Sequence, residues 1–306
     1  MNLDPGTRLT RRDLARLAPA IVPVAGLSLA ALYDALATSL GVDARSWTHA
    51  TAHAYRVVIG LPGFWASYAF SVWIAVAATA IAATAAALIG YATTRHETRT
   101  SRWRFAVLQF NLGVAHLVWA VALAAVLAPS GWIARIVAWS GIIDRPNQFP
   151  VLVNDDHGLG IILHLVTKET PFLVLATIPL ASRRLVTQLR QAATLGANRW
   201  ATLRHVYLPG VAPALVPGTI VVFAYALGAY EPAAVLGVQR PRTLAVVAVE
   251  WFRDPDLRMR AQAFAVSTIL LATVVAAAAV VLLITRNWWT IRANSSLRAA
   301  PTPVPA

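Results

Sequence analysis

Three charged side chains, Lys168, Glu169 and Glu231, lie inside stretches that otherwise consist almost entirely of apolar residues. Charges in such stretches are costly and usually face a cavity or pair with another helix. Lys168 and Glu169 are adjacent, so on a helix they point to different faces and do not form a simple mutual pair. Together with Tyr230, these residues are candidates for lining a solute pathway. The structural alternatives are an ion pair to another helix or a later start of the span for Lys168 and Glu169, and the cap of a broken helix near water for Glu231.

Asp155, Asp156 and His157 form the only compact group of acidic and imidazole side chains in the sequence. Such a group could bind a metal, but a solvated loop outside the membrane explains it better. The chain has no cysteine, and it contains no phosphate-binding loop, no HExxH zinc motif and no GxSxG nucleophile turn. We therefore expect no catalysis by this chain and no metal or cofactor held by it.

The composition of the chain places it in a membrane. Of its 306 residues, 58% are hydrophobic and 13% are charged, with a mean hydropathy of +0.61, whereas soluble domains carry about 25% charged residues. The net charge of +13 would suggest nucleic-acid binding in a soluble protein. Here the basic residues lie in short runs between apolar stretches, where they indicate membrane orientation and contact with anionic lipids. We expect no nucleic-acid partner.

Apolar stretches long enough to cross a bilayer, roughly 20 residues each, occur six times. They lie at about 17–36, 64–93, 105–128, 159–181, 208–236 and 261–285. The expected fold is an all-α, polytopic transmembrane bundle in one domain, 17–285, preceded by a segment 1–16 and followed by a tail 286–306 that ends in disorder. No cleavable signal peptide is evident, so we expect the first span to be retained.

The distribution of positive charge predicts the orientation of the bundle. The connections that would share a side with the two termini hold 16 Lys and Arg residues, and the opposite connections hold nine. The positive-inside rule therefore places both termini in the cytoplasm of a multi-pass inner-membrane protein. In the third span, Gln109, Asn111 and His116 should face other helices rather than lipid. Apolar residues at helical spacing from Trp132 to Trp139 predict a short helix at the outer interface.

The connection 183–207, before the fifth span, has the pattern of a helix, a turn and a second helix. Apolar residues recur at three-to-four spacing on both sides of Gly196: Leu185, Leu189 and Ala192 before it, and Trp200, Leu203 and Val206 after it. Gly196 itself permits the turn, and Pro209 loses no hydrogen bond if it occupies the first turn of the next span. Such a loop can insert its bend into a soluble partner and move as a rigid body with that span. The alternative is an amphipathic loop that touches only lipid and neighbouring helices.

At these residues the sequence resembles the integral-membrane permeases of binding-protein-dependent ABC importers, which have the MetI-like fold. Their cytoplasmic loop carries the pattern EAAxxxG, followed twelve residues after the Gly by Leu-Pro, and docks as a coupling helix into an ATPase subunit. Here Gly196 is followed at that distance by Leu208 and Pro209. The resemblance extends over spans two to six, including LGAYEPAAVLG (227–237) and KETPF (168–172). It implies the following contacts to the ATPase: Arg190, Gln191, Ala192, Gly196, Ala197, Trp200, Leu208 and Pro209.

One position departs from the family pattern. Where the family has its Glu this chain has Arg190, and Gln191 replaces the first Ala. The reversed charge puts any carried-over salt bridge to the ATPase in doubt and implies a compensating change in the partner. The docking geometry could survive, because apolar bulk and the Gly196 turn provide the shape.

The resemblance also implies the partners and the cycle. Two ABC ATPase subunits would use ATP, a second permease chain of the same or a different kind would complete the pore, and an external binding protein would deliver a small polar solute; membrane lipids surround the whole. Alternating access would move the solute inward, and the two quoted stretches are most similar to permeases for polyamines, iron and thiamine.

Two other functions stay open at this point. One is an ion-driven secondary transporter that uses Lys168, Glu169 and Glu231 as a charge relay. The other is a membrane enzyme acting on lipids, for which the sequence offers only the group around Asp155.

Overall fold

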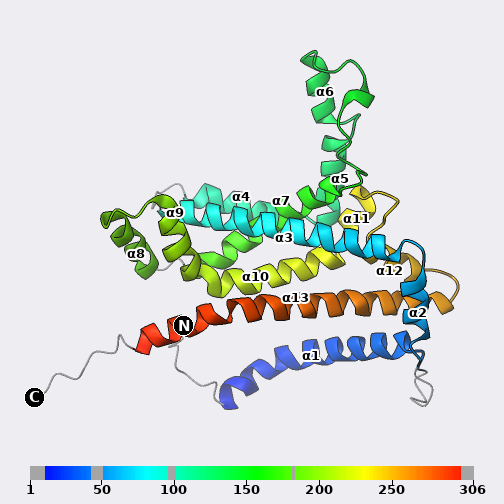
Figure 1. Cartoon of the computed structure of the whole chain (residues 1–306), viewed down its shortest axis with the longest axis horizontal. Helices are drawn as coiled ribbons and strands as arrows, with labels where there is room; N and C mark the ends of the chain where they lie inside the picture. The colour runs from blue at the N-terminus through cyan, green and yellow to red at the C-terminus, as the bar shows by residue number, and fades with distance from the viewer. Residues whose placement is uncertain (1–10, 43–50, 96–100, 181–182, 298–306) are drawn as a thin grey trace, which may run out of the picture. The chain divides into compact units, whose positions relative to one another are not determined.

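The computed structural model describes residues 11–42, 51–95, 101–180 and 183–297, and in these ranges the chain forms helices joined by turns and loops, with no strand (Figure 1). The α-helices are α1 (Arg11–Ser39), α2 (His53–Gly60), α3 (Phe64–Arg95), α4 (Ser101–Gly113), α5 (His116–Leu127), α6 (Trp132–Trp139), α7 (Leu159–Thr177), α8 (Arg183–Thr194), α9 (Arg199–Thr202), α10 (Leu208–Gly228), α11 (Glu231–Leu236), α12 (Leu244–Phe252) and α13 (Arg258–Leu297). Short 3₁₀ turns, η2 (Pro146–Gln148) and η3 (Ile178–Leu180), and a π-helical turn, η4 (Leu203–Tyr207), join some of them.

Six segments of the described chain are long and apolar enough to cross a membrane. They are Ile21–Ser39, Phe64–Arg95, His116–Trp139, Leu159–Leu180, Arg199–Gly228 and Arg258–Thr285. The prediction of an all-α bundle with six spans is therefore confirmed. The short helix predicted from Trp132 is α6.

The chain divides into two compact units. The first comprises the residues up to Leu61 together with Glu250–Thr268. Within it, the hydroxyls of Ser39 and Tyr55 are hydrogen-bonded at 2.7 Å. Nearly all the described apolar side chains in the first half of α1 are exposed, which suits a helix surrounded by lipid.

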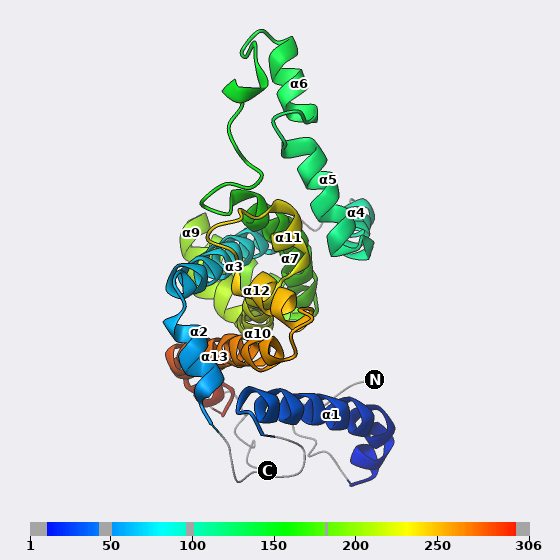
Figure 2. The same cartoon turned by 90° about the vertical axis from the view of Figure 1, so that its right-hand side faces the viewer.

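The second unit, Pro62–Val249 with Ile269–Ala306, is built around α3, α7 and α10, which run side by side (Figure 2). One buried cluster joins all three helices: Ala82 and Ala86 of α3, Leu173 and Val174 of α7, and Val222 of α10. Because α3 contributes only alanines to it, the three backbones can approach closely. This core is the scaffold from which α8 and α11 extend.

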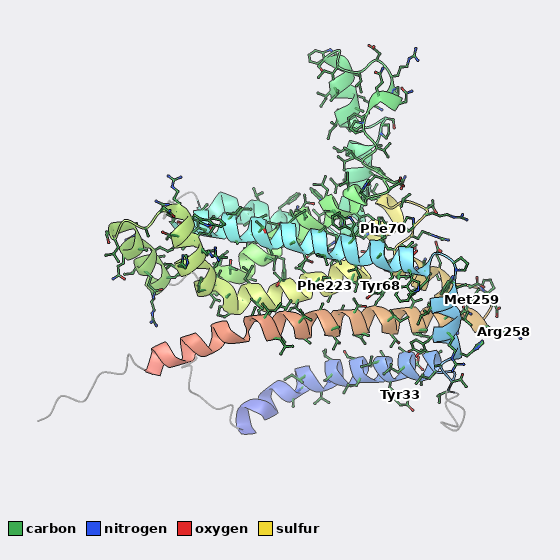
Figure 3. The ribbon with its side chains drawn as sticks, viewed as in Figure 1. Tyr33, Tyr68, Phe70, Phe223, Arg258 and Met259 are labelled. Atoms are coloured by element: carbon green, nitrogen blue, oxygen red, sulfur yellow. The ribbon has the colours of Figure 1, made fainter. Side chains whose placement is uncertain are left out.

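Hydrogen bonds from polar side chains of α3 connect it to further helices. The hydroxyl of Tyr68, labelled in Figure 3, lies 3.1 Å from the hydroxyl of Thr273 on α13. The hydroxyl of Ser71 accepts a hydrogen bond of 2.8 Å from the N–H of Leu244, the first residue of α12. Inside a bilayer such bonds satisfy groups that have no water available.

Two predicted spans are interrupted. The third, expected to be continuous, is broken between Gly113 and His116, and the fifth is broken between Gly228 and Glu231. The sixth runs on as helix to Leu297, into the predicted tail. The short helices α2 and α12 were not predicted. The expected disordered end falls at 298–306 and much of the segment 1–16 at 1–10, both outside the described residues.

Candidate functional site

The turn predicted in the connection between the fourth and fifth spans is present at Gly196. Its φ of +80° lies in the left-handed region, which glycine adopts without strain. The N–H of Ala197 donates to the carbonyl of Ala192 at 3.0 Å, and that of Gly196 to the carbonyl of Ala193 at 3.1 Å. These two bonds form a Schellman motif, so α8 ends in a defined geometry and the chain reverses there.

The second half of this loop continues directly into a membrane span. Asn198 caps α9, because its side-chain oxygen accepts the N–H of Ala201 at 2.7 Å. In η4 the N–H of Leu208 donates to the carbonyl of Leu203, five residues back. This wider turn accommodates Pro209, which has no N–H and whose ring collides with a preceding carbonyl in a regular helix. Helix therefore runs without a break from Arg199 to Gly228.

An apolar cluster holds α8 against this continuous helix. Its buried members are Leu185 and Leu189 of α8, Leu203 and Tyr207 of η4, and Val211 of α10. Burial of a side chain of this size contributes about 1.5–3 kcal/mol. The loop is thus fixed to the span and should move with it.

The tip of the loop is exposed. Leu195 is 86% exposed and Trp200 is 66% exposed, and Ala197 lies between them on the surface. The sequence pattern had placed Trp200 on one stripe with Leu203, but only Leu203 is buried. Large apolar side chains at the end of a polar loop indicate a surface that binds another molecule.

The remaining loop residues predicted to contact a partner are also accessible. Arg190 and Gln191 are exposed on α8, and Ala192 is half-buried. Leu208 and Pro209 are half-buried in the first turn of α10, where Pro209 was predicted. We name the segment Arg190–Trp200 the loop tip.

A close contact ties the loop to α3. The ring of Tyr207 meets that of Tyr91 edge to face at 5.5 Å, and its hydroxyl is within hydrogen-bonding reach of Thr94 and Thr177. A Cβ added at Gly90 would collide with that hydroxyl. Gly90 is therefore needed for Tyr207 to insert between α3 and α7.

We expect Gly90→Ala to destabilise the chain by about 1–3 kcal/mol through overpacking. Tyr207→Phe removes the colliding atom, so the double variant Gly90→Ala/Tyr207→Phe should lose less stability than the two single variants together. Thermal unfolding in detergent measures all three. Additive losses would show that the hydroxyl does not determine the contact.

Lys168 bridges two helices through its ammonium group. Its side chain is 1% exposed, and the ammonium donates to the carbonyls of Asn111 at 2.5 Å and Val114 at 2.6 Å. These carbonyls end α4 at the break in the third span, where a positive charge also favours the helix C-terminus. Lys168 therefore caps α4. The two structural alternatives considered from the sequence, an ion pair to another helix and a later start of the span, do not describe this role.

Aromatic and imidazole side chains surround the same break. His116, at the start of α5, has its Nδ1 3.3 Å from Nε2 of His164 on α7, and its ring lies 4.8 Å from that of Tyr225 on α10. Trp119 donates to the hydroxyl of Thr167 at 2.9 Å. The interhelical role predicted for His116 is confirmed.

The other two polar residues of the third span behave differently from His116. Asn111 uses its backbone carbonyl, whereas its side-chain oxygen is buried with no hydrogen-bond partner among the described residues. Gln109, expected to face other helices, is exposed. The reason is that α4 packs chiefly on α7, so the face of α4 that carries Gln109 stays exposed.

The carboxylates approach the same place from two helices. Glu169 is 9% exposed on α7, and Glu231 is exposed in the first turn of α11, which packs against α5. Both carboxylates are within electrostatic range of the hydroxyl of Tyr225. Tyr230 is half-buried in the break before α11.

We call the following residues the polar cluster: His116, His164, Lys168, Glu169, Tyr225 and Glu231. Sequence reasoning missed His164 and Tyr225 as members. For His164 a signal existed, because it precedes Lys168 by four residues and so shares its helix face.

The acidic group around Asp155 has a structural role. Asp155 is 7% exposed, and its carboxylate accepts the N–H groups of His157, Leu159 and Gly160 at 3.0, 2.9 and 3.3 Å. It caps the N-terminus of α7, so the prediction of a solvated loop was wrong for this residue. No group of three potential metal ligands occurs among the described residues.

The sequence model of the family described as "Binding-protein-dependent transport system inner membrane component" matches residues 84–288. The match begins within α3, ends within α13 and includes the Gly196 turn. The chain belongs to this family. The recognition of a MetI-like permease from the Gly196 to Leu208-Pro209 spacing is thereby confirmed, and the chain is a multi-pass membrane protein.

Curated relatives support the membership of this chain in the permease family. It is 31% identical over 153 residues to the inner membrane ABC transporter permease protein YnjC of Escherichia coli (strain K12), covering 49% of this chain. It spans only 30% of the length of that relative. It is 25% identical over 206 residues to the probable sulfate transport system permease protein cysT of Marchantia polymorpha, covering 67% of this chain and 68% of that protein.

Solved structures show the permease fold. A bacterial alginate ABC transporter, in complex with an alginate pentasaccharide-bound periplasmic protein, contains a chain that matches with a TM-score of 0.65 at 14% identity. The match covers 90% of this permease chain and 93% of that chain. A second structure of a bacterial alginate importer matches with a TM-score of 0.66.

Proposed function

We propose that this chain is the pore-forming permease subunit of an ATP-driven importer and that its loop tip docks into an ABC ATPase subunit. The observation that carries this proposal is the exposed pair Leu195 and Trp200, held on a loop that continues as helix into α10. Membership of a binding-protein-dependent transport family supports it.

The rigidity of the loop explains how a motor could act on the pore. The cluster around Tyr207 fixes α8 to the continuous helix Arg199–Gly228, so a displacement of the tip is transmitted to α10. The far end of α10 meets the break before Glu231 and the polar cluster. Closure of the ATPase pair would therefore tilt α10 and change access to that cluster, which is alternating access.

The polar cluster is the best candidate for the solute pathway. Broken helices that meet within a bilayer are where transporters bind their solutes. The ammonium of Lys168 is bound to the carbonyls of α4, and the other charged groups are the carboxylates Glu169 and Glu231. This balance favours a small hydroxylated or cationic solute, and a polyamine is the first to test.

The further partners follow from the same proposal. An external binding protein delivers the solute, and a second permease chain, identical or different, completes the pore within the surrounding lipid. The chain binds no ATP, which the ATPase subunits hydrolyse. A self-contained secondary transporter is the competing function.

Reconstitution separates these two functions. Proteoliposomes containing this chain with its ATPase subunits, binding protein and any second permease should take up labelled spermidine only when ATP is supplied. Sulfate, which appears in the name of one relative, is the anionic solute to compare with spermidine. Uptake by this chain alone under an ion gradient would contradict the proposal.

The loop tip also predicts the charge of the docking surface. The sequence from Thr170 to Tyr230 contains no Asp or Glu, whereas the connection 183–207 carries five arginines. A partner with a carboxylate-rich cleft fits such a surface. We expect Arg190→Glu to weaken binding of the ATPase about 10-fold, and Arg190→Gln to weaken it less. Co-purification of the two subunits at low and high salt measures the change in binding. Equal binding of the ATPase by the unchanged chain and by both Arg190 variants would exclude an electrostatic contact at Arg190.

A further inference from the structure

A cavity of about 180 Å³ lies between the end of α3 and α8, and Arg190, Ala193 and Ala197 of the loop tip help to line it. It is far larger than a single water needs. Two guanidinium groups line it from different helices, Arg95 from α3 and Arg190 from α8, together with Tyr91. The hydroxyl of Tyr91 is buried and has no hydrogen-bond partner among the described residues.

These groups together suit an anion. A guanidinium is always charged and presents a fork of N–H donors that matches the oxygens of phosphate. The hydroxyl of Tyr91 is itself enclosed by protein, so the two guanidinium groups are the donors that an anion in the cavity can reach. None of the described residues that line the cavity is acidic.

The length of α3 places this cavity at the level of lipid headgroups. The helix has 32 residues, which at 1.5 Å per residue makes it about 48 Å long. A bilayer measures roughly 40–45 Å including its headgroups. Arg95, the last residue of α3, therefore lies where lipid phosphates are found, and basic pockets between spans recognise such headgroups.

We propose that this cavity is a binding site for a phosphate group, supplied by the headgroup of an anionic lipid or by free phosphate. Arg95 and Arg190 hold the phosphate oxygens. The bound group joins α3 to α8. Because Tyr91 also contacts Tyr207, occupancy strengthens the packing that fixes the loop to α10.

The test measures thermal unfolding of the full chain in detergent while ligand is added. Phosphatidylglycerol, inorganic phosphate and zwitterionic phosphatidylcholine are the three probes. Tenfold excess over Kd should raise the melting temperature by about 2 °C. A rise with phosphatidylglycerol alone identifies a lipid, and a rise with inorganic phosphate as well identifies free phosphate as sufficient. An equal rise with phosphatidylcholine overturns the proposal.

Matched variants locate the site. Arg95→Gln should lose most of the rise, whereas Arg184→Gln, which removes an exposed arginine of α8 that does not line the cavity, should keep it. Equal ligand effects on Arg95→Gln and Arg184→Gln would show that phosphate does not bind here. Glu97 is the carboxylate nearest to Arg95 in the sequence. The variant Glu97→Gln should therefore keep or increase the rise in melting temperature. Loss of that rise in Glu97→Gln would also overturn the proposal.

Discussion

Replacing both Leu195 and Trp200 by serine should weaken binding of the ATPase subunit at least 30-fold and abolish ATP-driven uptake. Truncation of a central aromatic side chain in an interface costs about 2–4 kcal/mol, which corresponds to a factor of roughly 30 to 1,000 in Kd. Both side chains are exposed in the chain by itself. The substitutions should therefore leave its own stability almost unchanged. Co-purification of the two subunits measures the effect.

The matched control for the loop-tip variant changes the same kinds of residue elsewhere. Trp139 and Ile142 are 92% and 74% exposed on and after α6. The variant Trp139→Ser/Ile142→Ser should bind the ATPase normally. Equal loss of binding in both double variants would mean that general apolar surface, rather than the loop tip, holds the subunits together.

Lys168→Met should destabilise the chain by about 2–4 kcal/mol even without solute or partners. The substitution removes the ammonium donor from the carbonyls of Asn111 and Val114, and that of Asn111 keeps only a long bond of 3.4 Å from the N–H of Val114. A buried polar group that loses its partner costs about 1–3 kcal/mol. The break between α4 and α5 would lose the side chain that holds it. Thermal unfolding in detergent gives the loss as a lowered melting temperature.

Two further variants separate the role of Lys168 in the fold from a role in transport. Arg184→Met removes an exposed basic residue and should change stability by less than about 0.5 kcal/mol. Glu231→Gln should lower solute uptake while leaving the melting temperature unchanged, since Glu231 is exposed. If Lys168→Met proved as stable as Arg184→Met, capping of α4 would not be what Lys168 does.

The spans and the loop could be predicted because their signals are local. Hydropathy alone predicted six spans, although the third lies at His116–Trp139 rather than at 105–128. The spacing from Gly196 to Leu208 and Pro209 identified the family. The turn at Gly196 needs a residue that tolerates positive φ, and glycine is the residue that does so without strain, so its position in the sequence predicts the turn.

The break in the third span could not be predicted from its own sequence. Residues 105–128 contain no charged residue and no proline that would mark that break. The group that stabilises it, Lys168, comes from another helix more than 50 residues away. The break at Ala229–Tyr230 had a local signal in Pro232, which is tolerated in the first turn of a new helix. The break in the third span therefore depends on contacts between helices, which a single segment of sequence does not show. The break before α11 is indicated locally by its proline.

The polar residues show the same limit. The sequence places Asp155 in a loop, yet it is buried because its carboxylate accepts two N–H groups from the N-terminus of α7 and a third from His157 just before that helix. Tyr225 was not predicted as a member of the polar cluster because it lies in an unbroken apolar run. Its contact with His116 exists only because α5 and α10 pack near α7.

Disulfide crosslinking tests the coupling of this chain to a motor most directly. The chain contains no cysteine, so a single cysteine in place of the exposed Ala197 can be paired with single cysteines in the cleft of the ATPase subunit. We predict an ATP-dependent crosslink at this position and none from a cysteine in place of Ser140, an exposed residue just after α6. Absence of any crosslink from position 197 in a complex that still transports solute would contradict the account.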